Sequence, residues 1–543
     1  MGKIEESQQQ ELRNLRPSKW SRLKAVLIRV NNRVHYVEAL LSVVLVLFIA
    51  AMLDERLNPK SIDFGLRSSS LWVAVLAALS LWCTVIFFRR QLQSVLQSTK
   101  DSLVTILLLL TSVAAFKITL IFQMDIIAGY FLSVPKSFFL FLIPIAAPAM
   151  IQRMLFSGSL IVLFNVLHAL FLGFLLEQAF QYGMYVFCVS IMGALFVSQT
   201  RTRNSVHLAG FRTAIVSAIA AAVTSLSWGA ELPIYSDFVA KGMNFNFSMW
   251  EIAGWSALGG FIGGWVSSAL AMAVTPLSEI VLDYTTDLKL VELSRMDHPL
   301  LRELVMKAPG TYHHSIIVGS LSEAAAESIG ANALLVRVGS YYHDIGKIGR
   351  AEYFVENQTR GYNPHDHIRP SLSAKIIISH VKDGKALADE YKLGSAISDF
   401  IMQHHGRSLV SYFYNKAKQE AAQPDSEVNE SEISEEDYRY PGPNPQTKEA
   451  AIMALADSCE AATRSLIDPT PARIEAMVTK IITKALNDGL LDEAEITLRE
   501  LRLVAKAFNR ILMSIHHSRI QYPNQEEGMP PQNVTFLGKN VKS

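Results

Sequence analysis

Long hydrophobic runs dominate the first half of the chain, whereas the second half mixes short apolar stretches with charged residues. A helix needs about 20 apolar residues to cross the hydrocarbon core of a bilayer. Runs of about this length predict eight membrane spans, at residues 36–54, 71–89, 102–123, 126–150, 157–177, 183–200, 208–229 and 251–275. Pro135 and Lys136 interrupt the fourth. We therefore expect a polytopic α-helical membrane domain over residues 36–275.

Basic residues predict how these spans are oriented. The polar segment 1–35 carries Arg13, Arg16, Lys19, Arg22, Lys24, Arg29 and Arg33. If the spans alternate, loops on the same side carry Arg89, Arg90, Arg153, Arg201, Arg203 and Arg212. Because Lys and Arg collect on the cytoplasmic side, we expect the N-terminus and the second half of the chain in the cytoplasm. Because the polar lead is long, we expect the first span to be a retained anchor rather than a signal peptide. We interpret Lys117, inside the third span, as snorkelling to the outer interface.

Apolar residues at helical spacing continue through residues 276–308, between Pro276 and Pro299. This pattern predicts a connector helix, which either packs passively or passes conformational change between the two halves; the sequence leaves both open. Residues 309–522 also follow helical periodicity and show no useful strand alternation. We therefore expect an all-α second domain over 309–522, followed by a polar tail over 523–543.

Composition changes this picture in one important respect. The net charge of +1 excludes no class of protein by itself, and it gives no indication of a polyanionic partner such as nucleic acid. Cys83, Cys188 and Cys459 lie far apart, without the spacing of a disulfide framework or a CxxC zinc site. Histidine is unevenly placed, because 11 of the 14 histidines lie from His298 onward. The second domain is therefore rich in possible metal ligands.

The candidate ligands form the series H…HD…H…HH…D on five predicted helical elements: His314, His343, Asp344, His380, His404, His405 and Asp457. Imidazole with carboxylate suits iron, manganese or zinc. Seven ligands exceed what one ion with an open position would take. Neighbours on a helix point about 100° apart, so the pair His404 and His405 also favours two ions. Such a centre can activate water and hold a phosphoryl group.

Other polar features have less specific interpretations. Asp457 lies among small apolar residues, where a carboxylate is costly unless it is paired or liganded. We interpret the remaining histidines of this domain as structural or surface residues, with roles for His313 and His365 left open: His313, His365, His367, His516 and His517. The acidic stretch Pro424–Asp437 is expected to be solvated and partly disordered, with control of access to the site as the weaker alternative.

Several motifs occur in a fixed order through the second domain: "PGTYHHS", "YYHDIGK", "YFVENQ", "IMQHHG", "YRYPGPNPQTKEAAIMALADSCEA" and "RIQYP". In these motifs the chain resembles the seven-transmembrane-HD family, whose HD domain hydrolyses cyclic di-AMP. One anchor plus seven spans also fits that family. The resemblance implies a bacterial inner (plasma) membrane protein, with a cytoplasmic all-helical HD-type phosphohydrolase domain after the membrane domain.

The resemblance also implies roles for individual residues. The seven candidate ligands would hold two metal ions, iron or manganese. Asp344 would bridge them, Lys347 would contact the scissile phosphate, and a hydroxide activated by both metals would yield linear pApA. The implied partners are a cyclic dinucleotide and the lipid bilayer, without a nucleic acid polymer, and a homodimer is compatible with this organisation. The chain departs from the family at Asp54–Ser70, where a large extracytoplasmic domain is usual.

Four alternatives fit the sequence less well. A cyclic di-GMP phosphodiesterase of the HD-GYP type would carry Gly-Tyr-Pro after its paired histidines, where this chain has "HHGRSLVSYFY". A single-metal HD nucleotidase would leave His380, His404 and His405 unexplained. A membrane signalling receptor with a vestigial HD site conflicts with the complete ligand set. A transporter is disfavoured because, apart from Lys117, the spans carry little buried charge.

Overall fold

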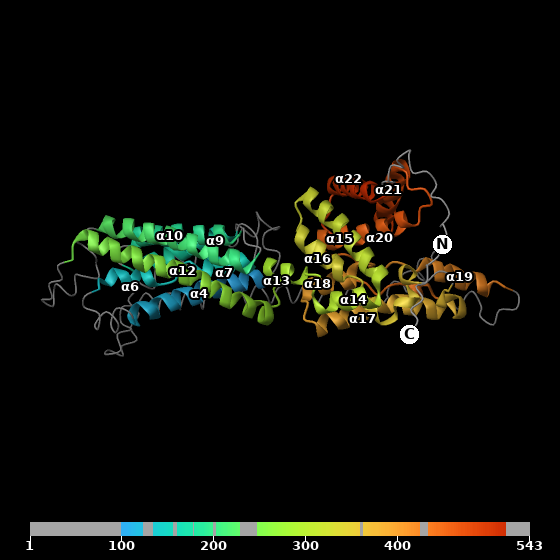
Figure 1. Cartoon of the computed structure of the whole chain (residues 1–543), viewed down its shortest axis with the longest axis horizontal. Coiled ribbons are helices and arrows are strands. Elements are labelled where there is room, and N and C mark those ends of the chain that lie inside the picture. Colours follow the sequence, from blue (N-terminus) through green and yellow to red (C-terminus); the bar gives the residue numbers. More distant parts are fainter. Residues whose placement is uncertain are drawn as a thin grey trace, which may run out of the picture. The chain divides into compact units, whose positions relative to one another are not determined.

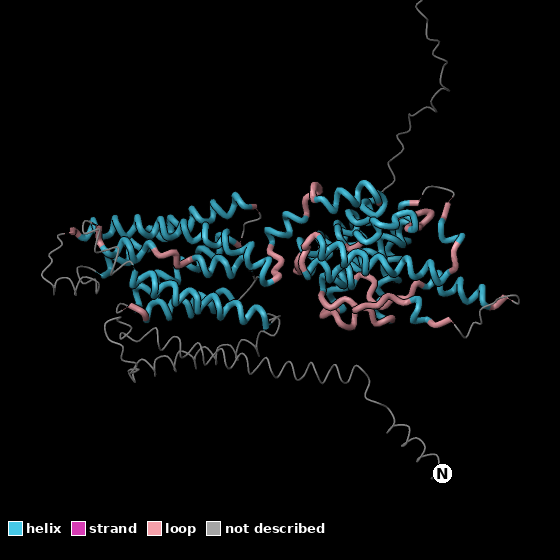
Figure 2. The backbone as a smooth tube through the Cα atoms, turned by 90° about the horizontal axis from the view of Figure 1, so that it is seen from below, coloured by secondary structure: helices cyan, strands magenta, loops and turns pink. Residues whose placement is uncertain are grey.

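The computed structural model describes residues 99–122, 134–155, 160–176, 179–198, 202–228, 247–358, 362–423 and 433–516. These residues form helices and loops, with one isolated β-bridge between Leu409 and Arg439 and no strand in the described ranges (Figure 2). The predicted all-α fold class is therefore confirmed. The spans predicted at 36–54 and 71–89, the basic segment, the Asp54–Ser70 linker and the C-terminal tail lie outside the described residues.

The chain divides into two compact units, Met1–Val291 and Glu292–Ser543, and the division falls inside the predicted connector 276–308. In the first unit the described helices run roughly alongside one another (Figure 1). Their bounds are α4 (Thr99–Ile121), α6 (Lys136–Leu142), α7 (Ala147–Leu155), α8 (Leu160–Phe174), α9 (Ala179–Val197), α10 (Arg203–Trp228) and α12 (Met249–Leu282).

The first unit has the composition of a membrane domain. Among the described residues, four helical stretches are long and apolar enough to span a bilayer: Lys136–Leu155, Phe180–Val197, Asn204–Ser227 and Met249–Leu282. On α10 an apolar stripe repeats every four residues and faces outward, with Phe211, Ile215, Ile219 and Val223 each at least 42% exposed. Exposed apolar stripes of this kind suit contact with lipid rather than with water.

Small residues allow the helices of this unit to approach closely. On α12 the buried positions include Gly260 and Gly264. A Cβ atom built on Gly260 would lie 2.6 Å from the Ser217 carbonyl oxygen, and one on Gly264 would lie 2.7 Å from the Ala214 Cα, both on α10. Backbone contact of this kind is a common basis of helix association in membranes, where burial from water supplies no driving force.

The structure corrects three sequence-based expectations in this unit. The fourth predicted span is not one continuous helix in its described part, because α6 follows directly after Pro135 and a break after Leu142 separates α6 from α7. Arg153 lies in the last turn of α7 and Arg212 lies within α10, so neither is a loop residue. Pro276 lies inside α12 rather than at a boundary, as membrane helices tolerate.

The predicted connector is not one helix. Asp283 adopts a left-handed conformation (φ 49°) and ends α12. A short helix, α13 (Asp287–Leu293), follows, and α14 (Pro299–Lys307) begins at Pro299, whose fixed backbone angle suits a first helical turn. The apolar spacing in the sequence does correspond to helices, but the left-handed Asp283 ends the first of them.

The second unit is a helical domain whose described elements are α14, α15 (Pro309–Ile329), α16 (Ala333–Tyr342), η2 (Ile345–Tyr353), η3 (Val355–Asn357), η4 (Pro364–His367), α17 (Pro370–Glu390), α18 (Ser395–Gln403), α19 (Ser411–Ala421), η6 (Glu435–Tyr438), α20 (Lys448–Arg464), α21 (Pro471–Asn487) and α22 (Leu498–Ile515).

One hydrophobic core holds this domain together. It is built from α15, α16, α18, α20, α21 and α22, and it includes the buried side chains of Val318, Phe400, Ile452 and Phe508. A smaller cluster joins Ala374 of α17 to Phe413 of α19 and to Tyr438. The described end of the acidic stretch is ordered, because η6 forms there and Ile433 packs against the small cluster.

Candidate metal centre

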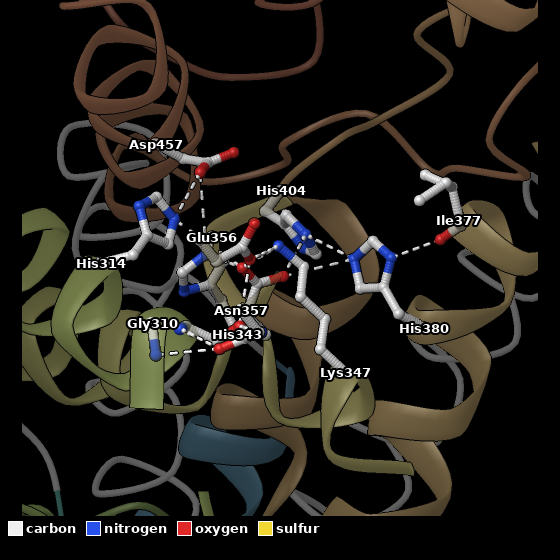
Figure 3. Close-up of polar contacts among 12 residues, drawn as sticks. Gly310, His314, His343, Lys347, Glu356, Asn357, Ile377, His380, His404 and Asp457 are labelled. Atoms are coloured by element: carbon white, nitrogen blue, oxygen red, sulfur yellow. Dashed lines mark hydrogen bonds and ion pairs between the residues drawn. The ribbon is translucent and has the colours of Figure 1, made fainter. Parts of the chain in front are cut away.

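Five helices of the second unit bring all seven predicted ligands together. The groups able to share a metal ion are His314, His343 and Asp457; His343, Asp344 and His404; and His380, His404 and His405. Within each group one ligand atom per residue lies within 4.8 Å of the others. Figure 3 shows His314 and Asp457 on one side of the cluster and His380 on the other. The overlapping groups form one continuous cluster of ligand atoms.

Each ligand lies where helix geometry holds it firmly. His314 is in the second turn of α15, His380 is within α17 and Asp457 is within α20. His343 and His404 are the C-cap residues that directly follow α16 and α18. The side chains of Asn332 and Thr447 cap the first turns of α16 and α20 by accepting backbone hydrogen bonds. Such caps stabilise a helix by about 1 kcal/mol and fix where it begins.

Asp344 links the two sides of the cluster through its two carboxylate oxygens. Oδ2 lies 3.2 Å from Nε2 of His343 and 3.7 Å from Nε2 of His314. Oδ1 lies 3.4 Å from Nε2 of His380 and 3.7 Å from Nε2 of His404. Oδ1 is buried and accepts no hydrogen bond from the described residues. A buried, unpaired carboxylate oxygen facing two imidazoles is the arrangement expected of a carboxylate that bridges two cations.

The contact between His380 and His404 also points to a cation. Nδ1 of His380 lies 2.5 Å from the Ile377 carbonyl oxygen, and Nδ1 of His404 lies 2.8 Å from that of Ile401. Each Nδ1 must therefore carry the proton, which leaves both Nε2 atoms as unprotonated lone pairs. These two atoms are 3.1 Å apart. Two lone pairs cannot hydrogen-bond to each other, so their convergence suits a metal ion.

Electrostatics differ between the two sides of the cluster. Burial lowers the pKa of His380 and of His404, and it lowers the pKa of His405 to about 3, so these rings are neutral. Burial also acts to lower the pKa of His343, but the charges of Asp344 and Asp457 outweigh it and raise that pKa to about 10. Asp457 and Glu460 raise the pKa of His314 in the same way, against the effect of burial. Without metal, the imidazoles on this side hold protons between the carboxylates. A bound cation would replace those protons.

The rings of His404 and His405 lie close together directly after α18. α18 ends at Gln403, so the pair lies in the turn after the helix, and the ring centroids are 4.0 Å apart. Both belong to one possible ligand group with His380. The helical angle is therefore the wrong argument for two ions here; the bridging position of Asp344 is the better one. His405 also packs on the ring of Tyr440, with centroids 4.2 Å apart.

Lys347 lies inside the cluster and is paired with acidic residues. Its ammonium is 2.7 Å from Oδ2 of Asp344 and 2.9 Å from Oε1 of Glu356. Burial acts to lower the pKa of Lys347, but these two negative charges outweigh it and raise the pKa above its usual range. Lys347 therefore remains a positive charge next to the carboxylate that faces both histidine groups.

The residues around η3 position α15 and its histidine. Oδ1 of Asn357 accepts hydrogen bonds from the backbone N–H groups of Gly310 and Thr311, at 2.9 Å and 3.2 Å (Figure 3). The Thr311 hydroxyl donates to Glu356 at 3.0 Å. These contacts satisfy free N–H groups in the first turn of α15, one turn before His314.

Sequence reasoning missed several residues that complete the site. Glu356, Asn357, Tyr440 and Glu460 all lie in motifs quoted above, but none was predicted as a site residue. Glu460 had a readable signal, because it follows Asp457 by three residues and must share its helix face. The other contacts join residues far apart in the chain and carry no periodic signal.

The other histidines of the domain lie outside the ligand groups. His313 and His367 are exposed. His365 is buried, packs against Phe413 and contacts the Tyr353 carbonyl oxygen through Nε2 at 2.9 Å. His516 is partly buried in the turn after α22, and His517 lies outside the described residues. The described positions of His367 and His516 agree with structural or surface roles, and His313 and His365 take part in none of the ligand groups.

Comparison with known proteins identifies both halves of the chain. Residues 68–286 match the family model described as a 7TM receptor with intracellular HD hydrolase, and residues 311–462 match the HD domain. The chain is 39% identical over 389 residues to the cyclic-di-AMP phosphodiesterase PgpH of Bacillus subtilis, covering 70% of this chain and 51% of that protein. The PgpH of Listeria monocytogenes is 39% identical over 394 residues, again 51% of its length.

The chain thus spans about half the length of these curated relatives. A crystal structure of the L. monocytogenes PgpH HD domain in complex with cyclic-di-AMP is 49% identical and covers 41% of this chain and 100% of that one, with a TM-score of 0.38. The membrane helices and the two family models together make this a membrane protein of the seven-transmembrane-HD family, with an HD domain following the membrane domain.

Proposed function

We propose that the chain is a membrane-anchored, metal-dependent phosphodiesterase that hydrolyses cyclic di-AMP to linear pApA. The observation that carries this proposal is the position of Asp344, whose two oxygens face two different histidine groups at 3.2–3.7 Å. The proposed ligands are His314, His343, Asp344, His380, His404, His405 and Asp457. The name of the relatives, cyclic-di-AMP phosphodiesterase, supports the choice of substrate.

Two metal ions, iron or manganese, fit this set of imidazoles and carboxylates. When bound, they would supply an activated water and neutralise charge on the phosphate. The reaction adds the water oxygen to phosphorus and breaks the P–O3′ bond, and the O3′ leaves with a proton. In this scheme Asp344 orients both ions, and Lys347 contributes a positive charge to the phosphate.

The proposed location follows from the basic residues of the sequence. Lys and Arg collect in segment 1–35, which favours a cytoplasmic N-terminus. An even number of spans would return the chain to the cytoplasm, where a dinucleotide messenger would reach the HD domain. We propose this orientation in a bacterial plasma membrane.

The test is hydrolysis by the full chain purified in detergent and loaded with Mn²⁺ or, without oxygen, Fe²⁺. Cyclic di-AMP and cyclic di-GMP are supplied side by side, and the products are separated by chromatography. We expect pApA from cyclic di-AMP, with Asp344→Asn as the inactive control. Metal-loaded protein that forms no pApA would contradict the proposal, and preference for cyclic di-GMP would favour the HD-GYP-like alternative.

The vestigial-receptor alternative has a separate test in cells. A signalling scaffold would keep its cellular effect after Asp344→Ala, because the membrane domain is unchanged. An enzyme would lose that effect, and cellular cyclic di-AMP would rise as in a strain lacking the protein. Unchanged cyclic di-AMP with an unchanged phenotype would favour the scaffold.

A further inference from the structure

Four ligand histidines have their second ring nitrogen held by a specific partner. Nδ1 of His343, His380 and His404 each faces the carbonyl oxygen of the residue three positions earlier, at 2.7, 2.5 and 2.8 Å. His314 differs, because its Nδ1 lies 2.5 Å from a carboxylate oxygen of Glu460, 146 positions away. One ligand histidine therefore has a charged partner where the other three have neutral ones.

The position of Glu460 is costly, which requires an explanation. Glu460 is only 4% exposed, and burying a carboxylate is unfavourable unless partners compensate. One oxygen faces His314, and the other lies 3.8 Å from the half-exposed guanidinium of Arg464. Glu460 stands three residues after Asp457 on α20, so one helix face presents both carboxylates to opposite nitrogens of the same ring. That arrangement has no evident use in the hydrophobic core.

We propose that Glu460 is a positioning residue for the metal centre. By accepting the Nδ1 proton of His314, its carboxylate fixes the ring and its tautomer, so that the Nε2 lone pair points to the ion position shared with His343 and Asp457. A carboxylate acceptor also makes the imidazole a stronger donor to the metal than a backbone carbonyl does. Glu460 touches neither the proposed ions nor the substrate.

This role makes the two ion positions unequal. The position near His314 is surrounded by Asp344 and Asp457, with Glu460 behind the ring, whereas the other has three histidines and one oxygen of Asp344. Loss of Glu460 should therefore weaken one ion much more than the other. Mutation of outer-shell partners typically weakens metal binding by about 10–100-fold.

The experiment measures Mn²⁺ binding by the full chain in detergent, by equilibrium dialysis and elemental analysis, without substrate. The variants are Glu460→Gln, which keeps an acceptor oxygen, and Glu460→Ala, which keeps none. We expect Glu460→Gln to bind one of two Mn²⁺ ions about 10-fold more weakly, and Glu460→Ala about 100-fold more weakly, with the second ion nearly unchanged. Glu449→Gln, on the first turn of the same helix, is the matched control and should keep both ions.

Melting in excess chelator separates this role from a merely structural one. We expect the metal-free forms of wild type and Glu460→Gln to unfold within a few degrees of each other, while added Mn²⁺ stabilises the variant less. If both Glu460 variants bound two ions at wild-type affinity, this inference would be overturned, but the proposed metal centre would not. The inference would also be overturned if the Glu460 variants bound both ions equally weakly and their metal-free forms were less stable than metal-free wild type. The inference rests on the proposed metal centre, so wild-type protein that binds no Mn²⁺ would overturn both.

Discussion

Lys347 is the residue that, in the proposed function, lies next to both the metal ions and the phosphate of the substrate. Figure 3 shows its side chain reaching into the middle of the cluster, between His343 and His380. Its ammonium contacts Asp344 and Glu356, so two negative charges hold one positive charge. If ions occupy the oxygens of Asp344, Lys347 loses part of that partnership and its charge becomes available to an anionic phosphate.

We expect Lys347→Met to lower kcat/KM for cyclic di-AMP by about 10–100-fold, because a hydrogen bond to a charged group contributes about 1.5–3 kcal/mol. Mn²⁺ stoichiometry should stay at the wild-type value, since Lys347 is not a ligand. Steady-state kinetics and elemental analysis on the same preparation measure both. Lys385→Met, which removes a solvent-accessible lysine paired with Asp389 on α17, should leave both unchanged. Loss of metal with Lys347→Met would instead show that Lys347 mainly holds Asp344 in place.

At the scale of single residues, the sequence singles out the seven proposed ligands, which the structure brings together, but not the residues that contact them. His343 with Asp344 and His404 with His405 form pairs that stand out in a helical domain, so the sequence singles them out. Glu356 becomes relevant only because η3 lies against the first turn of α15, a contact between residues 45 positions apart. Glu460 was within reach through its spacing from Asp457, but only the structure shows that it faces His314.

Among the elements, the close approach of η2 to α17 explains the glycine in "HDIGK". A Cβ atom on Gly346 would lie 1.8 Å from the His380 carbonyl oxygen and 2.5 Å from the backbone nitrogen of Gly384. No side chain can be accommodated there without moving backbone. The glycine thereby sets the distance between Asp344, just before η2, and His380 on α17.

We expect Gly346→Ala to destabilise the domain by at least about 1–3 kcal/mol, the usual cost of overpacking, and to abolish binding of at least one Mn²⁺ ion. Gly349→Ala is the matched control three residues later, where a Cβ atom would meet nothing within 4 Å. That change should be neutral or mildly stabilising. Chemical denaturation and metal analysis of both variants measure the difference. Equal behaviour of the two variants would show that η2 and α17 can separate without harming the site.

The elements themselves were predicted better than their ends. Apolar runs and helical spacing identify helices because burial against neighbours or lipid follows the helix period. Boundaries depend on single residues: Pro135 directly precedes α6, and Asp283 ends α12 although apolar spacing continues beyond it. Pro276 had the opposite effect, because the sequence suggested a boundary that α12 does not have.

For the whole molecule, the division into Met1–Val291 and Glu292–Ser543 separates membrane helices from ligands. All seven proposed ligands and Glu460 belong to the second unit. Its first residues still contribute to the site, because Leu293 accepts a 2.8 Å hydrogen bond from the hydroxyl of Tyr342. Tyr342 is fully buried and directly precedes His343, and the ring of His298 packs edge-on against it. The stability of a shortened chain should therefore depend on whether it begins before or after these few residues.

We expect a chain of residues 292–543 to fold without detergent, to bind as much Mn²⁺ as the full chain and to unfold within a few degrees of it, as measured by metal analysis and melting. A chain of residues 299–543 lacks Leu293 and His298 and leaves the buried Tyr342 hydroxyl without its acceptor, at a cost of about 1–3 kcal/mol. It should melt several degrees lower and lose Mn²⁺ more readily, because His343 follows Tyr342 directly. The variant Tyr342→Phe in residues 299–543 should recover part of that loss, since no hydroxyl is then left unpaired. If residues 292–543 aggregate or bind no Mn²⁺ while the full chain does, the second unit depends on the membrane domain for its fold.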